Sequence, residues 1–343
     1  MNYFIRCFVV IISLGLFYLA SYWLLVTNNT TSVSNKHETT SKESPPILKN
    51  LFDLVVKENS IFFLETSMKD FEHEVVTINR RASCALESAA LHHQNRTIYY
   101  IYVFPNDTET IYIKEKYLNM VLTYENIQVV YAKIDDLVRN TEIEELFSKH
   151  LIETSPFFVE HFSDAFRAII LMKFGGIYMD SDVIVLKSLD DLGGNFIGKE
   201  ISTILASGIM GFDENGIDLL SAALEDLNKN YNPKSWGGHG PLLFTKWVKK
   251  MCNATANFSY HECDYLRILP TNAFYPVSYG IWRHFFNPKY IDEIRNMVKN
   301  SYLIHIWNKL THGFILEADS NAPYLIFARE HCPKTVSKLY KSF

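Results

Sequence analysis

The chain has 343 residues, of which 48% are hydrophobic and 21% are charged, so it can bury the core of one large domain or two smaller ones. Its net charge of −5 and the lack of any Lys/Arg-rich run exclude a basic surface for a nucleic-acid backbone. We therefore expect a globular protein without a nucleic-acid partner.

The N-terminus contains an uncharged apolar run, residues 7–26, which has the length that an α-helix needs to cross a bilayer. A cleavable signal peptide is the alternative, because the small residues at 19–21 resemble a cleavage site, but the apolar run continues beyond them. Arg6 precedes the run and Lys36 is the first charge after it, so the positive-inside rule leaves residues 1–6 in the cytosol. We expect a single-pass type II signal anchor, with the rest of the chain in the lumen.

The segment after the apolar run has the composition of a flexible stem. Residues 27–44 contain one aliphatic side chain, Val33, and a Pro-Pro pair follows at residues 45–46. Such a segment cannot bury enough apolar surface to offset the entropy that it would lose on ordering. We predict a flexible lumenal stem over residues 27–57 and a folded domain over residues 58–343.

Four cysteines lie beyond the anchor, an even number in a compartment that permits disulfides. Cys252 and Cys263 enclose a short polar loop and are the favoured pair. Cys84 and Cys332 then form the second pair, although four cysteines allow three connectivities. A zinc site is the competing interpretation, but these cysteines lack the C-x-x-C spacing that is typical of one. Six Asn-x-Ser/Thr sequons suit a lumenal location and are glycosylation candidates: Asn28, Asn29, Asn95, Asn106, Asn253 and Asn257.

From residue 61 onward, short β-rich runs alternate with helical periodicity. The first half contains strands at 61–64, 97–103 and 127–131, and helices at 80–93, near 110–122 and at 156–174, the last ending at a Gly-Gly pair. The second half is less regular, with strands near 201–205, 209–212, 266–269 and 301–306, helices near 217–228 and 241–251, and a final helix. This α/β alternation predicts a mostly parallel sheet with helices on both faces, in which ligands bind at the carboxyl ends of the strands.

Two acids, Asp180 and Asp182, directly follow the apolar run 177–179 and precede a second apolar run at 183–186. Residues two apart in an extended chain point to the same side, and carboxylates in apolar surroundings are costly unless they are paired or bind a cation. Carboxylates with a nucleotide diphosphate form a ligand set that suits Mg²⁺ or Mn²⁺. An Asp-x-Asp pattern alone is also typical of a solvated turn, so its surroundings decide between the two interpretations.

The residues before the two acids give the pattern a specific context. Asp164 and Arg167 share one face of the preceding helix, opposite its apolar stripe, where the alternative to a functional role is a surface ion pair. Between this helix and the two acids lie Gly175, Gly176 and Tyr178. Together these residues resemble the sugar-binding motif of the DXD glycosyltransferases, whose nucleotide-sugar-binding domain is a Rossmann-like α/β fold of GT-A type.

Further segments resemble the alpha-1,4-galactosyltransferase family, and the resemblance extends from about residue 61 to the C-terminus. They are residues 62–67 (Phe-Phe-Leu-Glu-Thr-Ser), 84–90, 238–241 (Gly-His-Gly-Pro), 273–276 (Ala-Phe-Tyr-Pro), 305–308 (His-Ile-Trp-Asn) and 332–333 (Cys-Pro). The resemblance implies a hexosyltransferase of the Golgi membrane that moves galactose from UDP-galactose, with retention, in alpha-1,4 linkage. It also implies Mn²⁺ (or Mg²⁺) as cofactor and, as acceptor, the β-linked terminal sugar of a glycolipid such as lactosylceramide.

The same resemblance implies roles for individual residues. Asp180 and Asp182 bind the metal, which neutralises charge that develops on the departing UDP. Arg167 has the planar fork that suits a phosphate as well as sugar hydroxyls. The residues that contact the donor sugar are Asp164, Arg167, Gly175, Gly176 and Tyr178.

Four more residues are candidates for contacts with the donor or the acceptor. His305, on a late strand, is a third metal ligand, a phosphate contact or a buried structural histidine. His239 lies in the Gly-His-Gly-Pro segment, which either presents backbone N–H groups to a ligand or forms a plain loop before a helix. Glu65 follows the first strand at its carboxyl end, where such folds bind ligands. Asn308 belongs to the His-Ile-Trp-Asn motif.

Three alternative functions remain open at this point. An alpha-1,4-N-acetylhexosaminyltransferase would use UDP-N-acetylgalactosamine or UDP-N-acetylglucosamine with a glycolipid or glycoprotein acceptor, because pocket shape discriminates these sugars. A metal-dependent phosphodiesterase would need a cluster of further His and Asp ligands, which the sequence does not show. A non-catalytic lumenal sugar-binding protein would not need the intact set of Asp164, Arg167, Asp180 and Asp182. The sequence singles out no nucleophile for a retaining reaction.

Overall fold

The structure is a computed structural model that describes residues 48–67, 75–107, 112–113, 116–253, 262–339 and 343. Contacts divide the chain into two units, residues 1–44 and 45–343, and every described residue belongs to the second. The predicted cytosolic tail, the anchor, most of the stem, and the sequons at Asn28, Asn29 and Asn257 lie outside the described residues. Among the helices that are described, none has the length and apolar character of a membrane span.

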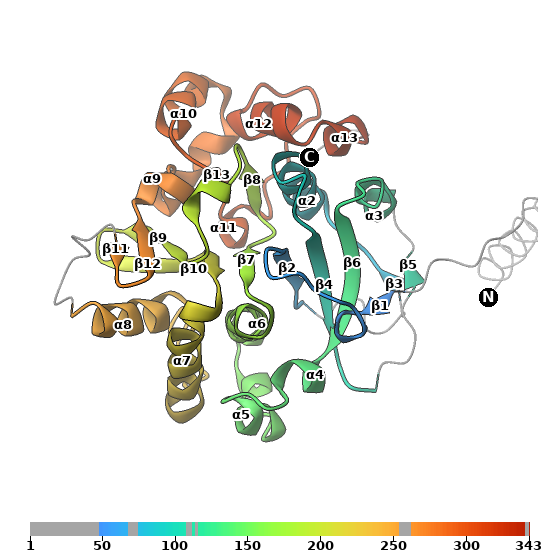
Figure 1. Ribbon diagram of the computed structural model, residues 1–343. Helices are drawn as coiled ribbons and strands as arrows, with labels where there is room; N and C mark the ends of the chain where they lie inside the picture. Colours follow the sequence, from blue (N-terminus) through green and yellow to red (C-terminus); the bar gives the residue numbers. More distant parts are fainter. Residues whose placement is uncertain (1–47, 68–74, 108–111, 114–115, 254–261, 340–342) are drawn as a thin grey trace, which may run out of the picture. The chain divides into compact units, whose positions relative to one another are not determined.

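A nine-stranded sheet with the order β1-β6-β4-β2-β7-β10-β9-β12-β11 forms the centre of the domain (Figure 1). Its strands are β1 (Lys49–Asn50), β2 (Ile61–Glu65), β4 (Ile98–Phe104), β6 (Ile127–Lys133), β7 (Gly176–Met179), β9 (Phe196–Ile201), β10 (Ile204–Phe212), β11 (Glu262–Cys263) and β12 (Leu266–Leu269). From β1 to β7 all neighbours are parallel, whereas β10 is antiparallel to both β7 and β9. Two small sheets pair β3 (Val75–Val76) with β5 (Tyr112–Ile113) and β8 (Val183–Val185) with β13 (Leu303–His305).

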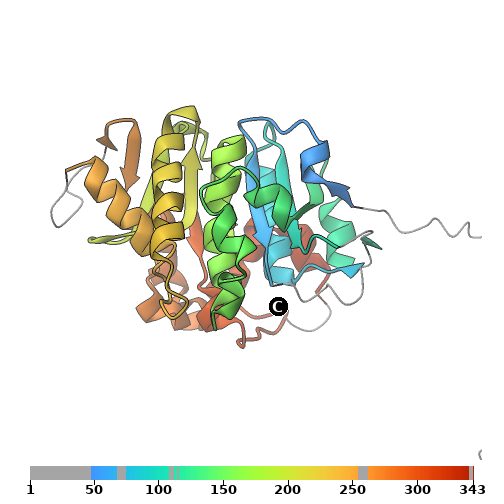
Figure 2. The same ribbon diagram turned by 90° about the horizontal axis from the view of Figure 1, so that it is seen from below.

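Helices cover both faces of the sheet, which explains why its central strands are apolar at consecutive positions. Phe62 and Phe63 of β2 point to opposite faces and enter two different hydrophobic clusters. The Phe62 cluster includes α4 (Ile134–Val138), α5 (Glu144–Ser148), α6 (Phe158–Phe174), α7 (Ile217–Asn230) and α8 (Pro241–Met251). The Phe63 cluster includes α2 (Arg80–His92), α3 (Lys116–Val121) and α9 (Thr271–Phe274). Figure 2 shows α6, α7 and α8 side by side on one face.

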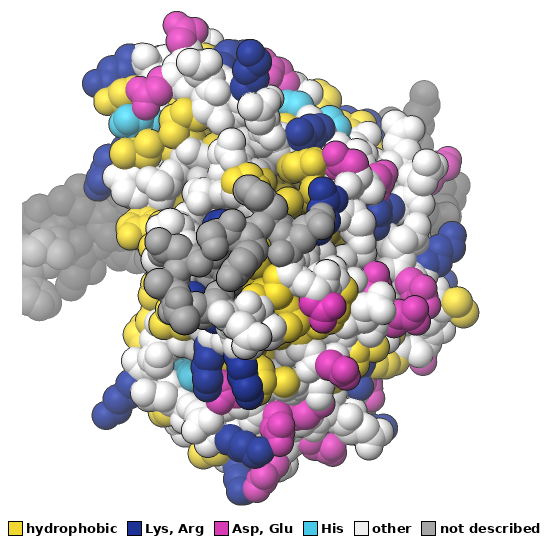
Figure 3. All heavy atoms as spheres, turned by 60° about the vertical axis from the view of Figure 1, so that its left-hand side comes forward, with side chains coloured by type: hydrophobic (Ala, Val, Ile, Leu, Met, Phe, Trp, Pro, Cys, Tyr) yellow, Lys and Arg dark blue, Asp and Glu magenta, His cyan; other side chains and the backbone are white. Residues whose placement is uncertain are grey.

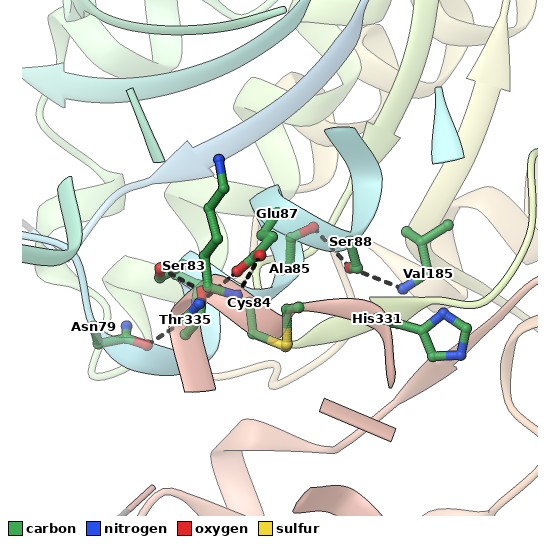
Figure 4. The surroundings of a disulfide bond; sticks show 12 residues. Asn79, Ser83, Cys84, Ala85, Glu87, Ser88, Val185, His331 and Thr335 are labelled. Atoms are coloured by element: carbon green, nitrogen blue, oxygen red, sulfur yellow. Dashed lines mark hydrogen bonds between the residues drawn. A yellow bond between two sulfur atoms is a disulfide. The ribbon is translucent and has the colours of Figure 1, made fainter. Parts of the chain in front are cut away.

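The C-terminal segment forms a third cluster with the β8–β13 pair. It contains the helices α10 (Ile291–Val298), α11 (Asn308–Thr311), α12 (Pro323–His331) and α13 (Pro333–Ser337), and the 3-10 segment η6 (Tyr279–Phe286). A disulfide between Cys84 and Cys332 connects α2 to this segment, with the two Cα atoms 5.1 Å apart (Figure 4). A second disulfide joins Cys252 to Cys263, with Cα atoms 5.6 Å apart. Both predicted pairings are confirmed.

A fully buried carboxylate, Glu87 of α2, lies beside the Cys84–Cys332 disulfide (Figure 4). Its two oxygens accept hydrogen bonds from the backbone N–H groups of Lys334 and Thr335, each at 2.7 Å, at the start of α13. The hydroxyl of Tyr124 donates a third bond, also at 2.7 Å. Every hydrogen bond of this group, the Glu87 site, comes from the protein itself, so the buried charge is compensated locally.

The α/β alternation predicted from the sequence is confirmed in the described residues, but some boundaries were wrong. The helix expected near 110–122 is shorter, because residues 112–113 pair as strand β5 and α3 begins at Lys116. The last part of the expected stem belongs to the folded domain, since β1 pairs with β6 and Leu51 is fully buried.

The strands expected at 201–205 and 209–212 form a different pair. Residues 204–212 make one continuous strand, β10, and its partner β9 comes earlier, at residues 196–201. Gly208, between the two expected strands, lies inside β10. Its missing side chain has a spatial reason there, because a Cβ would stand 2.6 Å from an oxygen of Asp180.

Candidate metal and donor site

Asp180 and Asp182 lie at the carboxyl end of β7, in the turn that leads into β8, and not within a strand as expected. The backbone N–H of Asp180 donates to the carbonyl of Gly208 on β10 at 2.8 Å. The carbonyl of Asp182 accepts from the N–H of Ile306, which follows β13, at 3.0 Å. The turn is therefore fixed between two strands from different parts of the chain.

His305, the last residue of β13, completes a cluster with the two acids. Its Nε2 lies 3.2 Å from Oδ1 of Asp182 and 3.7 Å from Oδ2 of Asp180. One ligand atom from each of the three residues lies within 4.8 Å of the others. We call Asp180, Asp182 and His305 the metal site, because two carboxylates and an imidazole are a donor set that fits a divalent cation.

Each carboxylate of the metal site has one oxygen that the protein already holds and one that faces His305. Oδ1 of Asp180 accepts the hydroxyl of Tyr178 at 2.7 Å and lies 3.3 Å from Nη1 of Arg167, whereas Oδ2 faces His305. Oδ2 of Asp182 accepts the backbone N–H of Asn308 at 2.6 Å, whereas Oδ1 faces His305. The two oxygens that face His305 and the imidazole nitrogen thus converge on one point.

The electrostatics of the metal site follow from its burial, since Asp182 is 9% exposed and His305 is 8% exposed. Burial alone lowers the pKa of His305, but the carboxylates of Asp182 and Asp180 outweigh it and raise that pKa to about 10. Burial disfavours the charge on Asp180, yet Arg167 and His305 outweigh it and lower the pKa of Asp180. Negative charge is thus stabilised where a cation would bind.

Tyr178 was predicted to contact the donor sugar, but in the structure it contacts Asp180 and Arg167 instead. It is buried, its hydroxyl donates to Asp180, and its ring lies under the Arg167 guanidinium, whose Cζ is 4.7 Å from the ring centroid. Tyr178 therefore orients Asp180 and Arg167, and it is not open for stacking on a sugar.

Asp164 and Arg167 of α6 are both buried, at 8% and 6% exposure, so they do not form a surface ion pair. Nη2 of Arg167 lies 3.5 Å from Oδ1 of Asp164, and burial raises the pKa of Asp164 to about 6 despite this cation. Arg167 also donates to the backbone oxygen of Ser207 at 2.9 Å and to the hydroxyl of Ser163 at 2.7 Å. Arg167 thus links the predicted donor-binding residue Asp164 to the metal site.

The Gly-His-Gly-Pro segment contacts this pair through a glycine. A Cβ on Gly240 would stand 2.2 Å from Oδ1 of Asp164 and 2.6 Å from the hydroxyl of Ser207. His239 donates through Nε2 to the carbonyl of Asn232 at 2.9 Å, and its ring centroid is 4.5 Å from that of His161. Gly240 of this predicted segment adjoins Asp164, whereas His239 organises the loop.

Glu65, Gly175 and Gly176 are not brought into the metal site by any described contact. Glu65 ends β2, where its carboxylate accepts from the N–H of Ser67 at 2.8 Å. Gly175 and Gly176 have φ of 65° and 96°, and a Cβ on Gly176 would stand 2.4 Å from the carbonyl of Ser60. Gly175 caps α6 and Gly176 begins β7, whereas the acids follow that strand, so the glycines are needed for the helix-to-strand turn, roughly 13 Å from the acids along the strand.

Arg81 of α2 is a site residue that the sequence did not reveal. It donates to Oδ1 of Asn308 at 2.8 Å, to Oγ1 of Thr311 at 2.7 Å and to the carbonyl of Phe314 at 2.9 Å. The same Asn308 donates its N–H to Asp182. Arg81 therefore positions the segment that holds Asp182, although more than two hundred residues separate the partners in sequence.

One face of the domain carries charges of both signs. Figure 3 shows Lys and Arg side chains interspersed with Asp and Glu over one face, without a continuous basic area. Asn95, Asn106 and Asn253 are exposed, as glycosylation candidates must be. Their modification stays a prediction.

Two protein-family models match the chain. The glycosyltransferase sugar-binding region containing the DXD motif matches residues 79–197, and the alpha 1,4-glycosyltransferase conserved region matches residues 212–339. The first match contains Asp180 and Asp182, and the second contains His305 and Asn308.

Several relatives of known name align with most of the chain. Lactosylceramide 4-alpha-galactosyltransferase of Mus musculus is 31% identical over 285 residues, covering 83% of this chain and 77% of the relative. The Homo sapiens protein of the same name is 28% identical over 277 residues, covering 80% and 76%. Alpha-1,4-N-acetylglucosaminyltransferase of Homo sapiens is 27% identical over 293 residues, covering 84% and 83%.

Solved structures with some similarity include glycosyltransferases. The PaToxG glycosyltransferase aligns with 60% of this chain and 70% of its own, at 15% identity and a TM-score of 0.40. The galactosyltransferase LgtC, in complex with donor and acceptor sugar analogs, aligns with 81% of this chain and 95% of its own, at 12% identity and a TM-score of 0.33.

Proposed function

This chain belongs to the alpha-1,4-glycosyltransferase family, and we propose that it moves galactose from UDP-galactose, in alpha-1,4 linkage and with retention, onto the β-linked terminal sugar of a glycolipid such as lactosylceramide. The observation that supports this most is the metal site, in which Asp180, Asp182 and His305 each turn one ligand atom toward a common point. A divalent cation at such a place can neutralise the charge that develops on a departing nucleotide diphosphate.

Oδ2 of Asp180, Oδ1 of Asp182 and Nε2 of His305 are the atoms that would hold the cation, which we propose is Mn²⁺. When bound, the cation supplies positive charge for the diphosphate of the departing UDP. The protein positions the ligands in advance, because Tyr178 and Asn308 fix the remaining carboxylate oxygens. This arrangement loses little further freedom when the donor binds.

We propose that Asp164 accepts hydroxyls of the donor sugar. Its Oδ1 is held by Arg167 at 3.5 Å and by the hydroxyl of Ser207 at 3.5 Å, which leaves Oδ2 for the sugar. Arg167 was expected to reach a phosphate as well, but its described contacts use Nε, Nη1 and Nη2 within the protein. Arg167 is therefore a positioning residue between the sugar and metal sites.

We also propose a Golgi location with a type II anchor at residues 7–26. The two disulfides of the lumenal domain support an oxidising compartment. The exposed sequons at Asn95, Asn106 and Asn253 are compatible with it.

A transfer assay tests this function. The purified full chain, in detergent with Mn²⁺, is offered UDP-galactose, UDP-N-acetylgalactosamine or UDP-N-acetylglucosamine, each with lactosylceramide or a β-galactoside glycopeptide as acceptor. We expect transfer of galactose to lactosylceramide, with an alpha anomeric proton and a 1,4 linkage in the product by NMR.

The relative that is an alpha-1,4-N-acetylglucosaminyltransferase supports a second candidate donor. Preferential use of UDP-N-acetylglucosamine or UDP-N-acetylgalactosamine would replace the galactose assignment and keep the transferase. Consumption of none of the three donors, with either acceptor, would contradict the proposed function.

A further inference from the structure

Tyr275 has a buried hydroxyl that the protein leaves without a partner. The residue is 2% exposed, and its Oη is one of three buried side-chain polar atoms in the described residues without a hydrogen bond. Native proteins rarely bury a polar group in this way unless a ligand or water pairs with it. Tyr275 caps the short helix α9 and belongs to the Ala-Phe-Tyr-Pro motif noted in the sequence.

The hydroxyl of Tyr275 lies next to the metal site. The Tyr275 ring centroid is 5.4 Å from that of His305 and 5.6 Å from that of Trp307. A Cβ on Gly208 would stand 3.0 Å from the Tyr275 hydroxyl and 2.6 Å from Oδ2 of Asp180. Gly208 therefore keeps open the space between this hydroxyl and the carboxylate oxygen that faces His305.

A tyrosine hydroxyl carries its proton at neutral pH and can donate a hydrogen bond to an incoming oxygen atom. The neighbouring acids do not use this proton, because Tyr275 has no hydrogen bond to them. An oxygen atom that enters the space beside Gly208 would pair with it.

We propose that Tyr275 is a binding residue of the metal and donor site, and that its hydroxyl donates a hydrogen bond to an oxygen that enters this space with the divalent cation. That oxygen belongs either to water or to the diphosphate of the donor, which share the same acceptor chemistry. This inference rests on the proposed function, since it assigns a further residue to the same site. It explains both the unpaired hydroxyl and the glycine at position 208.

The experiment measures Mn²⁺ binding to the full chain in detergent, by EPR of free Mn²⁺, and Mn²⁺·UDP binding by calorimetry. In the variant Tyr275→Phe, which removes one oxygen atom, we expect affinity to fall about tenfold, as for the loss of one hydrogen bond to a charged group. If the variant already binds Mn²⁺ more weakly in the absence of UDP, the hydroxyl bonds to water. If only its affinity for Mn²⁺·UDP falls, the hydroxyl bonds to the diphosphate. Equal affinities of variant and wild type for both would overturn the proposal.

Thermal unfolding without metal separates binding from structure. Because the hydroxyl of Tyr275 has no partner in the protein, Tyr275→Phe should unfold at the same temperature as the wild type or a higher one. The matched control is Tyr102→Phe, since that buried hydroxyl donates to the carbonyl of Thr77 at 2.6 Å. The control should unfold at a lower temperature and keep its Mn²⁺·UDP affinity. A fall in unfolding temperature for Tyr275→Phe as large as for Tyr102→Phe would contradict the proposal.

A second variant fills the space between the Tyr275 hydroxyl and Oδ2 of Asp180 from the side of Gly208. Gly208→Ala places a methyl group beside both oxygens, and we expect at least the same tenfold loss of Mn²⁺·UDP affinity. Gly313→Ala is its control, because a Cβ there meets no atom within 4 Å. Equal Mn²⁺·UDP affinity of Gly208→Ala and Gly313→Ala would contradict the proposal. If the wild type binds neither Mn²⁺ nor Mn²⁺·UDP, the proposed function itself is overturned. If the wild type binds both and transfers sugar, the variants test only the role of Tyr275.

Discussion

Two carboxylate sites pair with the C-terminal segment of the chain, and they differ in how the protein pairs their charges. At the Glu87 site, both oxygens accept hydrogen bonds from Tyr124, Lys334 and Thr335. At the metal site, Asp180 and Asp182 keep one oxygen each turned toward His305. A buried charge that the protein satisfies by itself contributes to folding, whereas one that it leaves partly free is held ready for a ligand.

This comparison predicts that changes near the Glu87 site alter stability, while changes at the metal site alter binding and transfer. The clearest separation would use variants in which one property changes and the other stays constant. The comparison is contradicted if one of the variants below changes stability and binding or transfer together.

The largest effect on stability is expected from the disulfide next to Glu87. Replacing Cys84 and Cys332 with Ser opens a loop of 248 residues, and chain entropy suggests a loss of about 5 kcal/mol in the free energy of unfolding. Replacing Cys252 and Cys263 opens a separation of 11 residues and should cost about 3 kcal/mol. Denaturant titration of both double variants measures the difference. A larger loss of stability on removing Cys252–Cys263 than on removing Cys84–Cys332 would contradict this prediction.

The variant Glu87→Gln should lower the free energy of unfolding by about 1–3 kcal/mol. Its amide places an NH₂ group against one of the two backbone N–H groups at the start of α13, so a buried donor is left unpaired. Urea titration checks the stability, and calorimetry checks Mn²⁺·UDP affinity in the folded variant. Unchanged stability would mean that the buried charge is not used for folding.

His93, next to the C-terminal end of α2, makes the fold sensitive to acid. Burial lowers the pKa of His93 to about 4, and the hydrogen bond from Nδ1 to the carbonyl of Ala89, at 3.0 Å, opposes this shift only in part. Nε2 accepts the N–H of Leu189 at 2.9 Å, so the native arrangement needs the neutral imidazole. The unfolded chain binds a proton near pH 6.5 and the folded protein only near pH 4, so stability is lost as pH falls through this window. The loss approaches about 3 kcal/mol below pH 4.

Denaturant titration at several pH values tests this, with His93→Gln as the comparison. The variant should be less stable at pH 7 but should lose less stability between pH 6.5 and pH 4 than the wild type does. Identical pH dependence in both proteins would show that another group is responsible.

The smallest effect is expected at Arg81, which connects the two regions. Arg81→Lys keeps the charge but loses the fork that bonds Asn308, Thr311 and the carbonyl of Phe314, so kcat/KM should fall about tenfold, or ~1.4 kcal/mol. The loss should shrink as Mn²⁺ concentration is raised, since the substitution loosens a ligand and removes none. The exposed variant Arg139→Lys is the control and should behave as wild type. A loss that does not respond to Mn²⁺ would assign Arg81 a purely structural role.

The sequence predicted those features that depend on short-range patterns. The strand and helix periodicity over residues 61–103 is confirmed, because buried strands with helices on both faces give continuous apolar runs. The spacing of Asp180 and Asp182 and the motif that contains His305 and Asn308 also named residues that the fold brings into one cluster. The family resemblance supplied the meaning of that spacing.

The features that the sequence missed depend on contacts between distant segments. Arg81 reaches Asn308 across the fold, and Gly208 opens a space that only the position of Tyr275 explains. Gly175 and Gly176 were expected to contact the sugar, but their positive φ values show that the backbone itself requires glycine. A motif identifies which residues matter, and only the fold distinguishes a ligand contact from a backbone requirement.

The variant Asp182→Asn tests the central claim most directly, through Mn²⁺-dependent transfer from UDP-galactose to lactosylceramide. The substitution removes the charge of one metal ligand but can retain the acceptor for the N–H of Asn308. We expect transfer to fall at least about 100-fold, while the unfolding temperature without metal stays within about 4 °C of the wild type. Transfer at the wild-type rate, with the same dependence on Mn²⁺, would contradict the metal site and the function proposed for it.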